Sequence, residues 1–113
     1  MKYSIVFPGQ GSQSLGMMSD LNQNFSVVNE VFQEASDSIG VDLWKILNED
    51  QEALNLTENT QPVMLAAGHA TYKVLSEETS VSPVSMAGHS LGEYTALVAS
   101  NSIDFFDAIE LVR

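Results

Sequence analysis

Two short apolar runs in this chain each stop abruptly at a glycine-rich turn, and the segments between and after them have helical periodicity. The first run covers residues 3–7 and ends at Pro8 and Gly9; the second covers residues 84–87 and ends at Gly88. Short runs bounded by turn residues predict β-strands. Because helical segments separate the two strands, we predict an α/β fold in which the strands pair in parallel.

A first helix is predicted from about Ser26 to Ile39, because apolar residues recur there at helical spacing and Gly40 suits a left-handed C-terminal cap. Asp42 stands where it can cap a short helix that follows directly. Residues 48–59 are polar and are expected to form a connection with no more than one helical turn.

A longer helix is predicted to begin at Thr60, which suits an N-cap, with Pro62 in the first turn where no amide proton is needed. This helix should end near Glu77. Residues 91–99 predict a helix that is buried on all sides, and Asp104 is expected to cap a last helix that continues toward residue 113.

Two strands make an incomplete sheet, because parallel sheets are normally covered on both faces and contain several strands. No segment has the length or composition of a linker between domains. We therefore expect residues 1–113 to be the opening part of one larger domain.

Composition and charge exclude several classes of protein. Of the 113 residues 44% are hydrophobic, which is enough for one packed core. The formal charge of -11, from 15 acidic and 4 basic residues, predicts that nucleic acid is repelled. No segment has the roughly 18 consecutive apolar residues of a membrane helix, and there is no cysteine. A cytoplasmic protein that binds neither nucleic acid nor membranes is expected.

Residues 88–92, Gly-His-Ser-Leu-Gly, fit the G-x-S-x-G pattern of a nucleophile elbow, with a predicted strand before it and a predicted helix after it. Such a turn holds the serine in a strained conformation, and small neighbours allow the close packing that this needs. The helix that follows directs free N–H groups toward any oxyanion formed on the serine. Ser90 is therefore a candidate nucleophile, with an ordinary glycine-rich turn as the alternative.

The glycine-rich loop over residues 9–16 fits neither phosphate-binding pattern. Ser14 stands in place of the third glycine of the dinucleotide fingerprint, and Met17 and Met18 replace the lysine and the hydroxyl residue of a phosphate loop. We interpret the segment as a donor loop whose backbone N–H groups supply part of an oxyanion hole. A plain turn is the alternative.

A serine nucleophile needs a general base, and His69 and His89 are the two histidines in the sequence. His89 adjoins Ser90, and neighbouring side chains at a strand end point in opposite directions, so we do not expect His89 to accept the serine proton. His69 lies in the middle of a predicted helix among alanines, which favours a packing role. The two histidines lack the spacing of metal ligands, so no metal site is expected.

Glu93 falls in the first turn of a predicted helix, where a carboxylate interacts favourably with the helix dipole.

Several short motifs occur together along the whole chain: FPGQGSQ at residues 7–13, LW at 43–44, TQP at 60–62, AGHSLGEYTAL at 87–97 and IDFFDA at 103–108. In this combination the sequence resembles the malonyl-CoA:acyl carrier protein transacylases of fatty acid synthesis, which are relatives of the acyltransferase domains of polyketide and fatty acid synthases. FPGQGSQ and GHSLGEY, in this order and at this separation, are far more specific than G-x-S-x-G alone.

The resemblance implies that Ser90 accepts the acyl group and that the backbone N–H groups of Gln10 and Leu91 form the oxyanion hole. It assigns His89 and Glu93 supporting positions beside the nucleophile, between and after the motif glycines Gly88 and Gly92. The implied reaction is ping-pong transfer of malonyl from malonyl-CoA to the phosphopantetheine thiol of acyl carrier protein. The coenzyme A thioester is then a substrate, and no metal or redox cofactor is implied.

The implied fold is an α/β-hydrolase-like subdomain, with a ferredoxin-like subdomain that lies outside this chain. The resemblance also puts the catalytic histidine and the carboxylate-binding arginine beyond Arg113, so the 113 residues alone are not expected to be a competent transferase. Two alternatives stay open: a serine hydrolase that gives the acyl group to water, and a fragment that folds or interacts without catalysis.

Overall fold

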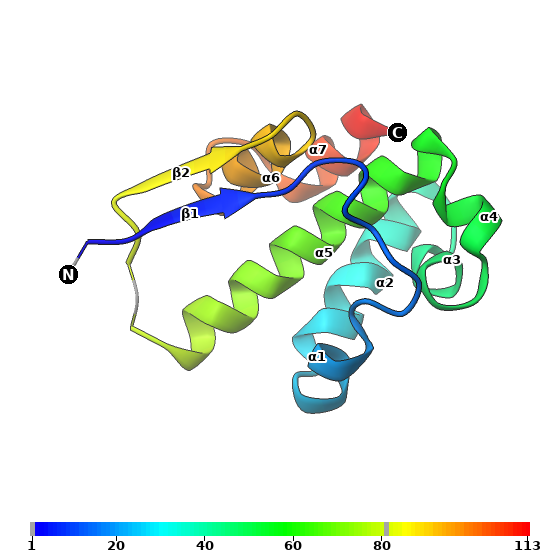
Figure 1. The fold of residues 1–113 in the computed structure, drawn as a ribbon, viewed down its shortest axis with the longest axis horizontal. Coiled ribbons are helices and arrows are strands. Elements are labelled where there is room, and N and C mark those ends of the chain that lie inside the picture. Colours follow the sequence, from blue (N-terminus) through cyan, green and yellow to red (C-terminus); the bar gives the residue numbers. More distant parts are fainter. Residues whose placement is uncertain (1, 81) are drawn as a thin grey trace.

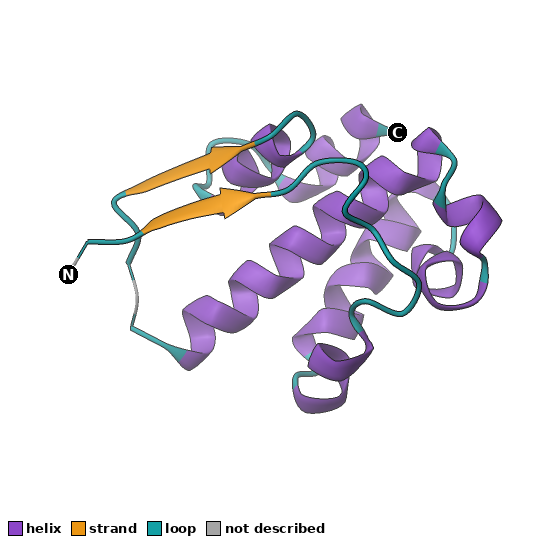
Figure 2. Cartoon of the chain, in the orientation of Figure 1, coloured by secondary structure: helices purple, strands orange, loops and turns teal. Residues whose placement is uncertain are grey.

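The computed structural model of the chain describes residues 2–80 and 82–113. Two strands, β1 (Ser4–Phe7) and β2 (Ser85–Gly88), lie side by side and parallel, as Figure 2 shows. Ser4 is paired with Ser85, and Phe7 with Gly88. The predicted α/β architecture with parallel pairing is confirmed at this level.

The described residues form seven helices, which Figure 1 labels in chain order: α1 (Ser19–Asn24), α2 (Val27–Ile39), α3 (Leu43–Glu49), α4 (Gln51–Leu54), α5 (Thr57–Glu78), α6 (Gly92–Ala99) and α7 (Phe105–Val112). The long helix α5 runs through the centre of the molecule, with α2 against one of its sides and α6 against another. Helix α6 also packs against both strands, so it joins the sheet to the helical part.

The predicted helix ends are confirmed at three positions. Gly40 ends α2 in the left-handed conformation, with φ 69°, and its N–H donates to the Ser36 carbonyl over 2.8 Å. The Asp42 carboxylate caps α3 by accepting from the N–H of Lys45 over 3.1 Å. Asp104 caps α7 in the same way. In α3 and α7, a short polar side chain supplies the hydrogen-bond acceptor that the N–H groups of the first turn lack.

Two predictions about helices were wrong, and one helix was not predicted. Helix α5 begins at Thr57 rather than Thr60, because the buried Thr60 hydroxyl donates back to the carbonyls of Leu54 and Leu56 instead of capping a new helix. Helix α6 is not buried on all sides, since Leu97 is 43% exposed. Helix α1 was not predicted, because Leu21 is the one apolar residue among its six and a single apolar residue forms no amphipathic pattern.

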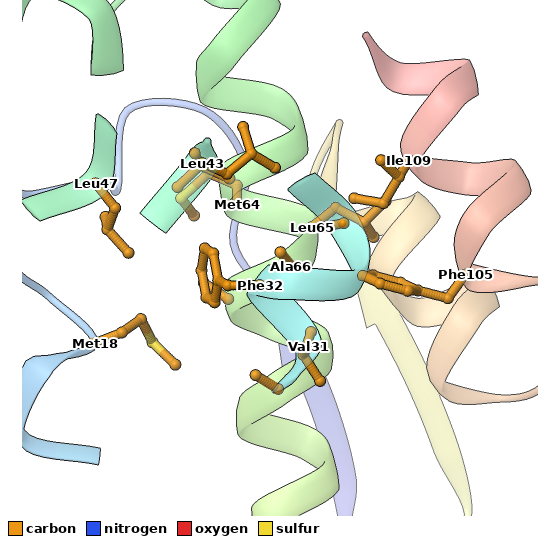
Figure 3. Packing of buried hydrophobic residues seen from close by; sticks show 14 of the residues in the cluster. Met18, Val31, Phe32, Leu43, Leu47, Met64, Leu65, Ala66, Phe105 and Ile109 are labelled. Carbon is orange, nitrogen blue, oxygen red and sulfur yellow. The ribbon is translucent and has the colours of Figure 1, made fainter. Parts of the chain in front are cut away.

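The main core lies among the helices rather than under the sheet. Figure 3 shows the side chains of Phe32, Leu43, Leu47 and Met64 gathered between α2, α3 and α5. Phe32 is fully buried and meets the Trp44 ring edge-on, with 5.2 Å between ring centroids. Most of the buried apolar side chains therefore lie in the helical layer, which contacts the small sheet through α6.

His69 of α5 belongs to this packing. Its ring stacks on Phe105 of α7, with 4.4 Å between centroids and 24° between planes, and its buried Nδ1 atom has no partner among the described residues. Burial, and to a smaller extent the positive charge of Lys73, lowers the pKa of the imidazole from 6.5 to about 4. The packing role expected for His69 agrees with these contacts.

No helix in residues 2–80 or 82–113 combines the length and the apolar composition needed to cross a membrane.

Replacing Phe32 with alanine should lower the free energy of unfolding by about 3–5 kcal/mol, because it leaves a cavity at the centre of the helical core. Phe106→Ala is the matched control, since Phe106 is 45% exposed, and it should cost less than about 1 kcal/mol. Urea unfolding of both variants checks this. Equal losses in the two variants would contradict the position assigned to the core.

The low pKa of His69 predicts a pH dependence of stability. Because the unfolded chain binds a proton on this residue near pH 6.5 and the folded chain only near pH 4, stability is full above pH 6.5 and falls as the pH decreases toward 4. Between pH 7.5 and 5, the free energy of unfolding of the parent protein relative to His69→Gln should fall by on the order of 1–2 kcal/mol. This range already allows for the partial exposure of the ring. Thermal or urea unfolding across this range tests it, and a constant difference between the two proteins would refute it.

Candidate active site

Ser90 lies at the sharp turn between the end of β2 and the start of α6. Its φ is 55°, in the left-handed region of backbone conformation that residues other than glycine rarely adopt. The turn is closed by hydrogen bonds from Gly92 N–H to the His89 carbonyl and from Glu93 N–H to the Ser90 carbonyl, each 3.0 Å long. A strained serine between a strand and a helix is the geometry of a nucleophile elbow.

Two glycines allow the turn to be this tight. A Cβ atom on Gly88 would overlap the backbone of Gly92 and Glu93, and one on Gly92 would overlap the carbonyl group of Phe7 at the end of β1. The first turn of α6 is thus in backbone contact with both strands. Any other residue at either position would push α6 away from the sheet and move Ser90 with it.

The glycine-rich loop reaches the same point. A Cβ atom on Gly9 would lie 2.5 Å from the carbonyl oxygen of His89, and the N–H of His89 donates to the Phe7 carbonyl over 3.1 Å. The loop after β1 and the turn after β2 therefore lie against each other. Of the two candidate oxyanion donors, Gln10 directly follows Gly9 and Leu91 lies two residues after His89.

Neither the Gln10 N–H nor the Leu91 N–H donates to any other described residue. Leu91 precedes the first residue of α6, where backbone N–H groups point out of the helix end. By contrast, the Gly11 N–H is already used, because it donates to Oε1 of Gln13 over 2.8 Å. The arrangement offers two unpaired donors near an exposed serine, which is what stabilisation of an oxyanion requires.

No general base for Ser90 is found in the described residues, where no side chain hydrogen-bonds to its hydroxyl. His69 is engaged with Phe105, as described above. His89 is exposed, and its Nδ1 atom would lie 3.4 Å from a Cβ atom on Gly9, so its ring lies against the glycine loop. Glu93 is exposed in the first turn of α6, where its charge favours the helix dipole. The same described ranges contain no group of three or more metal-ligand side chains.

The sequence did not indicate which residues hold the donor loop. Gln10 Nε2 donates to the Thr57 hydroxyl over 3.1 Å, and Gln13 Nε2 donates to Oδ1 of Asn55 over 3.2 Å. Asn55 and Thr57 lie at the junction of α4 and α5, within residues expected to be a polar connection with one helical turn. Sequence offers little signal here, because these contacts join segments more than 40 residues apart.

Two hollows flank the sheet. One of about 310 Å³ lies between β1, the glycine loop and α5, where Phe7 meets Tyr72 edge-on. The other is a larger groove along β2 and the outer face of α6, in which Val84 and Leu97 are exposed. Within residues 2–80 and 82–113, β2 pairs with β1 alone, so its other edge is free beside these exposed apolar side chains.

Comparison with known proteins agrees with these features. A family model described as "Acyl transferase domain" matches residues 4–113. A malonyl CoA-acyl carrier protein transacylase of Haemophilus influenzae is 50% identical over 114 residues, which cover 99% of this chain and 36% of that protein. The chain thus spans little more than a third of the length of this curated relative.

Solved structures are similar over the same range. An acyl carrier protein S-malonyltransferase from Vibrio cholerae has a TM-score of 0.96 and 49% identity, covering 99% of this chain and 37% of that one. A malonyl-transacylase solved in complex with its type II PKS acyl-carrier protein has a TM-score of 0.96 and 51% identity, with the same coverage. The resemblance to malonyl-CoA:acyl carrier protein transacylases is confirmed, and the chain belongs to the acyl transferase domain family.

Proposed function

We propose that this chain is the nucleophile-bearing part of a malonyl-CoA:acyl carrier protein S-malonyltransferase of fatty acid synthesis. The observation that carries the proposal is the strained Ser90, with φ 55°, beside the unpaired N–H of Leu91 in its own turn and that of Gln10 in the loop after β1. Proteins named as transacylases share about half of the residues of this chain. Malonyl-CoA and acyl carrier protein are accordingly the proposed substrate and partner.

The proposed reaction has two balanced steps. In the first, Ser90 Oγ attacks the thioester carbonyl carbon of malonyl-CoA, its proton passes to a general base, and coenzyme A leaves as the thiol after reprotonation. In the second, the phosphopantetheine thiol of acyl carrier protein attacks the resulting ester and Ser90 regains its proton. In both steps the Gln10 and Leu91 N–H groups stabilise the negative charge on the carbonyl oxygen.

The general base is proposed to come from outside these 113 residues. His69 is held against Phe105 and is hard to protonate, with a pKa of about 4, and the His89 ring lies on the glycine loop. We assign His89 and Glu93 supporting roles, His89 in packing the two loops together and Glu93 in stabilising the first turn of α6. Gly88 and Gly92 provide the close backbone contact.

The finer fold assignment is also proposed: residues 1–113 are the N-terminal part of an α/β-hydrolase-like subdomain. The free edge of β2 and the exposed apolar side chains of Val84 and Leu97 support it, because an edge of this kind is normally paired or covered. Further strands and helices of the same subdomain would cover this groove. A cytoplasmic location follows from the proposed role in fatty acid synthesis.

The proposal predicts that the complete protein, mixed with malonyl-CoA, gains a malonyl adduct on Ser90. Ser90→Ala should abolish the adduct, whereas Ser26→Ala, a substitution of an exposed serine at the start of α2, should not. Intact mass and peptide mapping measure both. Circular dichroism controls for folding.

The same experiment separates the alternatives. Transfer of the adduct to added acyl carrier protein supports the transacylase, while release of free malonate without transfer would identify a serine hydrolase. An unreactive Ser90 in the folded, complete protein would overturn the proposal and leave a non-catalytic role.

A further inference from the structure

The donor loop is fastened to the rest of the protein at its two glutamines. Gln10 donates its side-chain amide to the Thr57 hydroxyl, and Gln13 donates to the Asn55 side chain, over 3.1 and 3.2 Å. Oε1 of Gln13 simultaneously accepts from the N–H of Gly11. Each glutamine therefore joins a backbone position of the loop to a fixed acceptor at the α4–α5 junction.

The junction itself is rigid, which makes it a suitable anchor. The buried Thr60 hydroxyl donates to the Leu54 and Leu56 carbonyls, and the Asn59 side chain donates to the Ala53 carbonyl over 3.1 Å. Backbone N–H groups also donate to two of these carbonyls, from Leu56 to Ala53 and from Asn59 and Thr60 to Leu56, so the junction is bonded at several points. Asn55 and Thr57 sit directly between the residues held in this way.

The two contacts hold the loop segment that carries the Gln10 N–H. Gln13 takes the Gly11 N–H, whereas the Gln10 N–H, directly after Gly9 at its contact with His89, donates to no described residue. An oxyanion donor must lie within a few tenths of an ångström of its place, and a displacement of about 1 Å can cost up to about 100-fold in rate. A loop held at one end by Gly9 alone would leave the Gln10 N–H free to rotate away.

We propose that Asn55 and Thr57 are positioning residues of the oxyanion hole. They act through the side chains of Gln13 and Gln10 and fix the direction of the Gln10 N–H, without touching the substrate. The inference rests on the proposed function of Ser90 as the acyl acceptor.

The test compares Thr57→Val, which removes the acceptor at nearly constant shape, with Thr57→Ser, which keeps it. The double variant Asn55→Ala/Thr57→Val removes both anchors. Thr71→Val is the matched control, because Thr71 is an exposed threonine of the same helix whose hydroxyl bonds only within that helix or weakly to a methionine sulfur. All are made in the complete protein, and the melting temperature of each is measured.

Two probes report on Ser90. An alkyl fluorophosphonate forms an Oγ–P bond with Ser90 and expels fluoride. Its phosphoryl oxygen is stabilised by the oxyanion donors, and its reaction does not depend on a pocket for the malonyl group. Malonyl-CoA then gives kcat and KM for transfer. The double variant should react about 10-fold more slowly with both probes, with KM for malonyl-CoA within about twofold of the parent. Thr57→Ser and Thr71→Val should keep the parent rates.

Equal rates in the parent and the double variant, or a loss in Thr57→Ser as large as in Thr57→Val, would overturn the positioning role. A loss confined to KM would also overturn it. If the parent reacts with the fluorophosphonate but not with malonyl-CoA, the proposed function fails while the rates with the first probe still decide the positioning role. A parent inert to both probes overturns both proposals.

Discussion

The backbone contact between Gly92 and the end of β1 is the constraint on which the candidate site depends. Because neither Gly92 nor Gly88 carries a side chain, the first turn of α6 rests directly on the strands, and the chain must reverse within the three residues between these glycines. Ser90 takes up that reversal with φ 55°. The same contact puts the N-terminal end of α6 beside the loop that follows β1.

The strain at Ser90 is carried by packing elsewhere in the molecule. A serine held in the left-handed region costs on the order of 1–3 kcal/mol, and a two-stranded sheet is too small to impose it. Helix α6 is held from behind by the long helix α5, where Thr95 lies close enough to Gly68 that a Cβ atom there would overlap it. Helix α5 in turn is fixed by the core around Phe32 and Leu65. The helical layer thus stabilises a turn that has little stability of its own.

Much of this arrangement could be predicted from local sequence. Both strands, the helix before Gly40 and the caps at Asp42 and Asp104 followed from short patterns, because propensity and capping act over a few residues. The start of α5 was predicted wrongly because a threonine before Gln-Pro resembles an N-cap, whereas the buried Thr60 hydroxyl donates to preceding carbonyls. The exposed face of α6 could not be read from its apolar composition, since burial depends on which elements cover it. The anchors of the donor loop join distant segments and leave no local pattern.

The site would be tested most directly by comparing Gly92→Ala with Gly40→Ala in the complete protein and measuring the rate at which Ser90 reacts with an alkyl fluorophosphonate. A Cβ atom on Gly92 overlaps the Phe7 carbonyl, so α6 must shift and the rate should fall by about 100-fold. Gly40 has φ 69° but no atom within 4 Å of an added Cβ. Its substitution should cost about 1 kcal/mol of stability and leave the rate unchanged. A folded Gly92→Ala protein with the parent rate would contradict the dependence of the site on this contact.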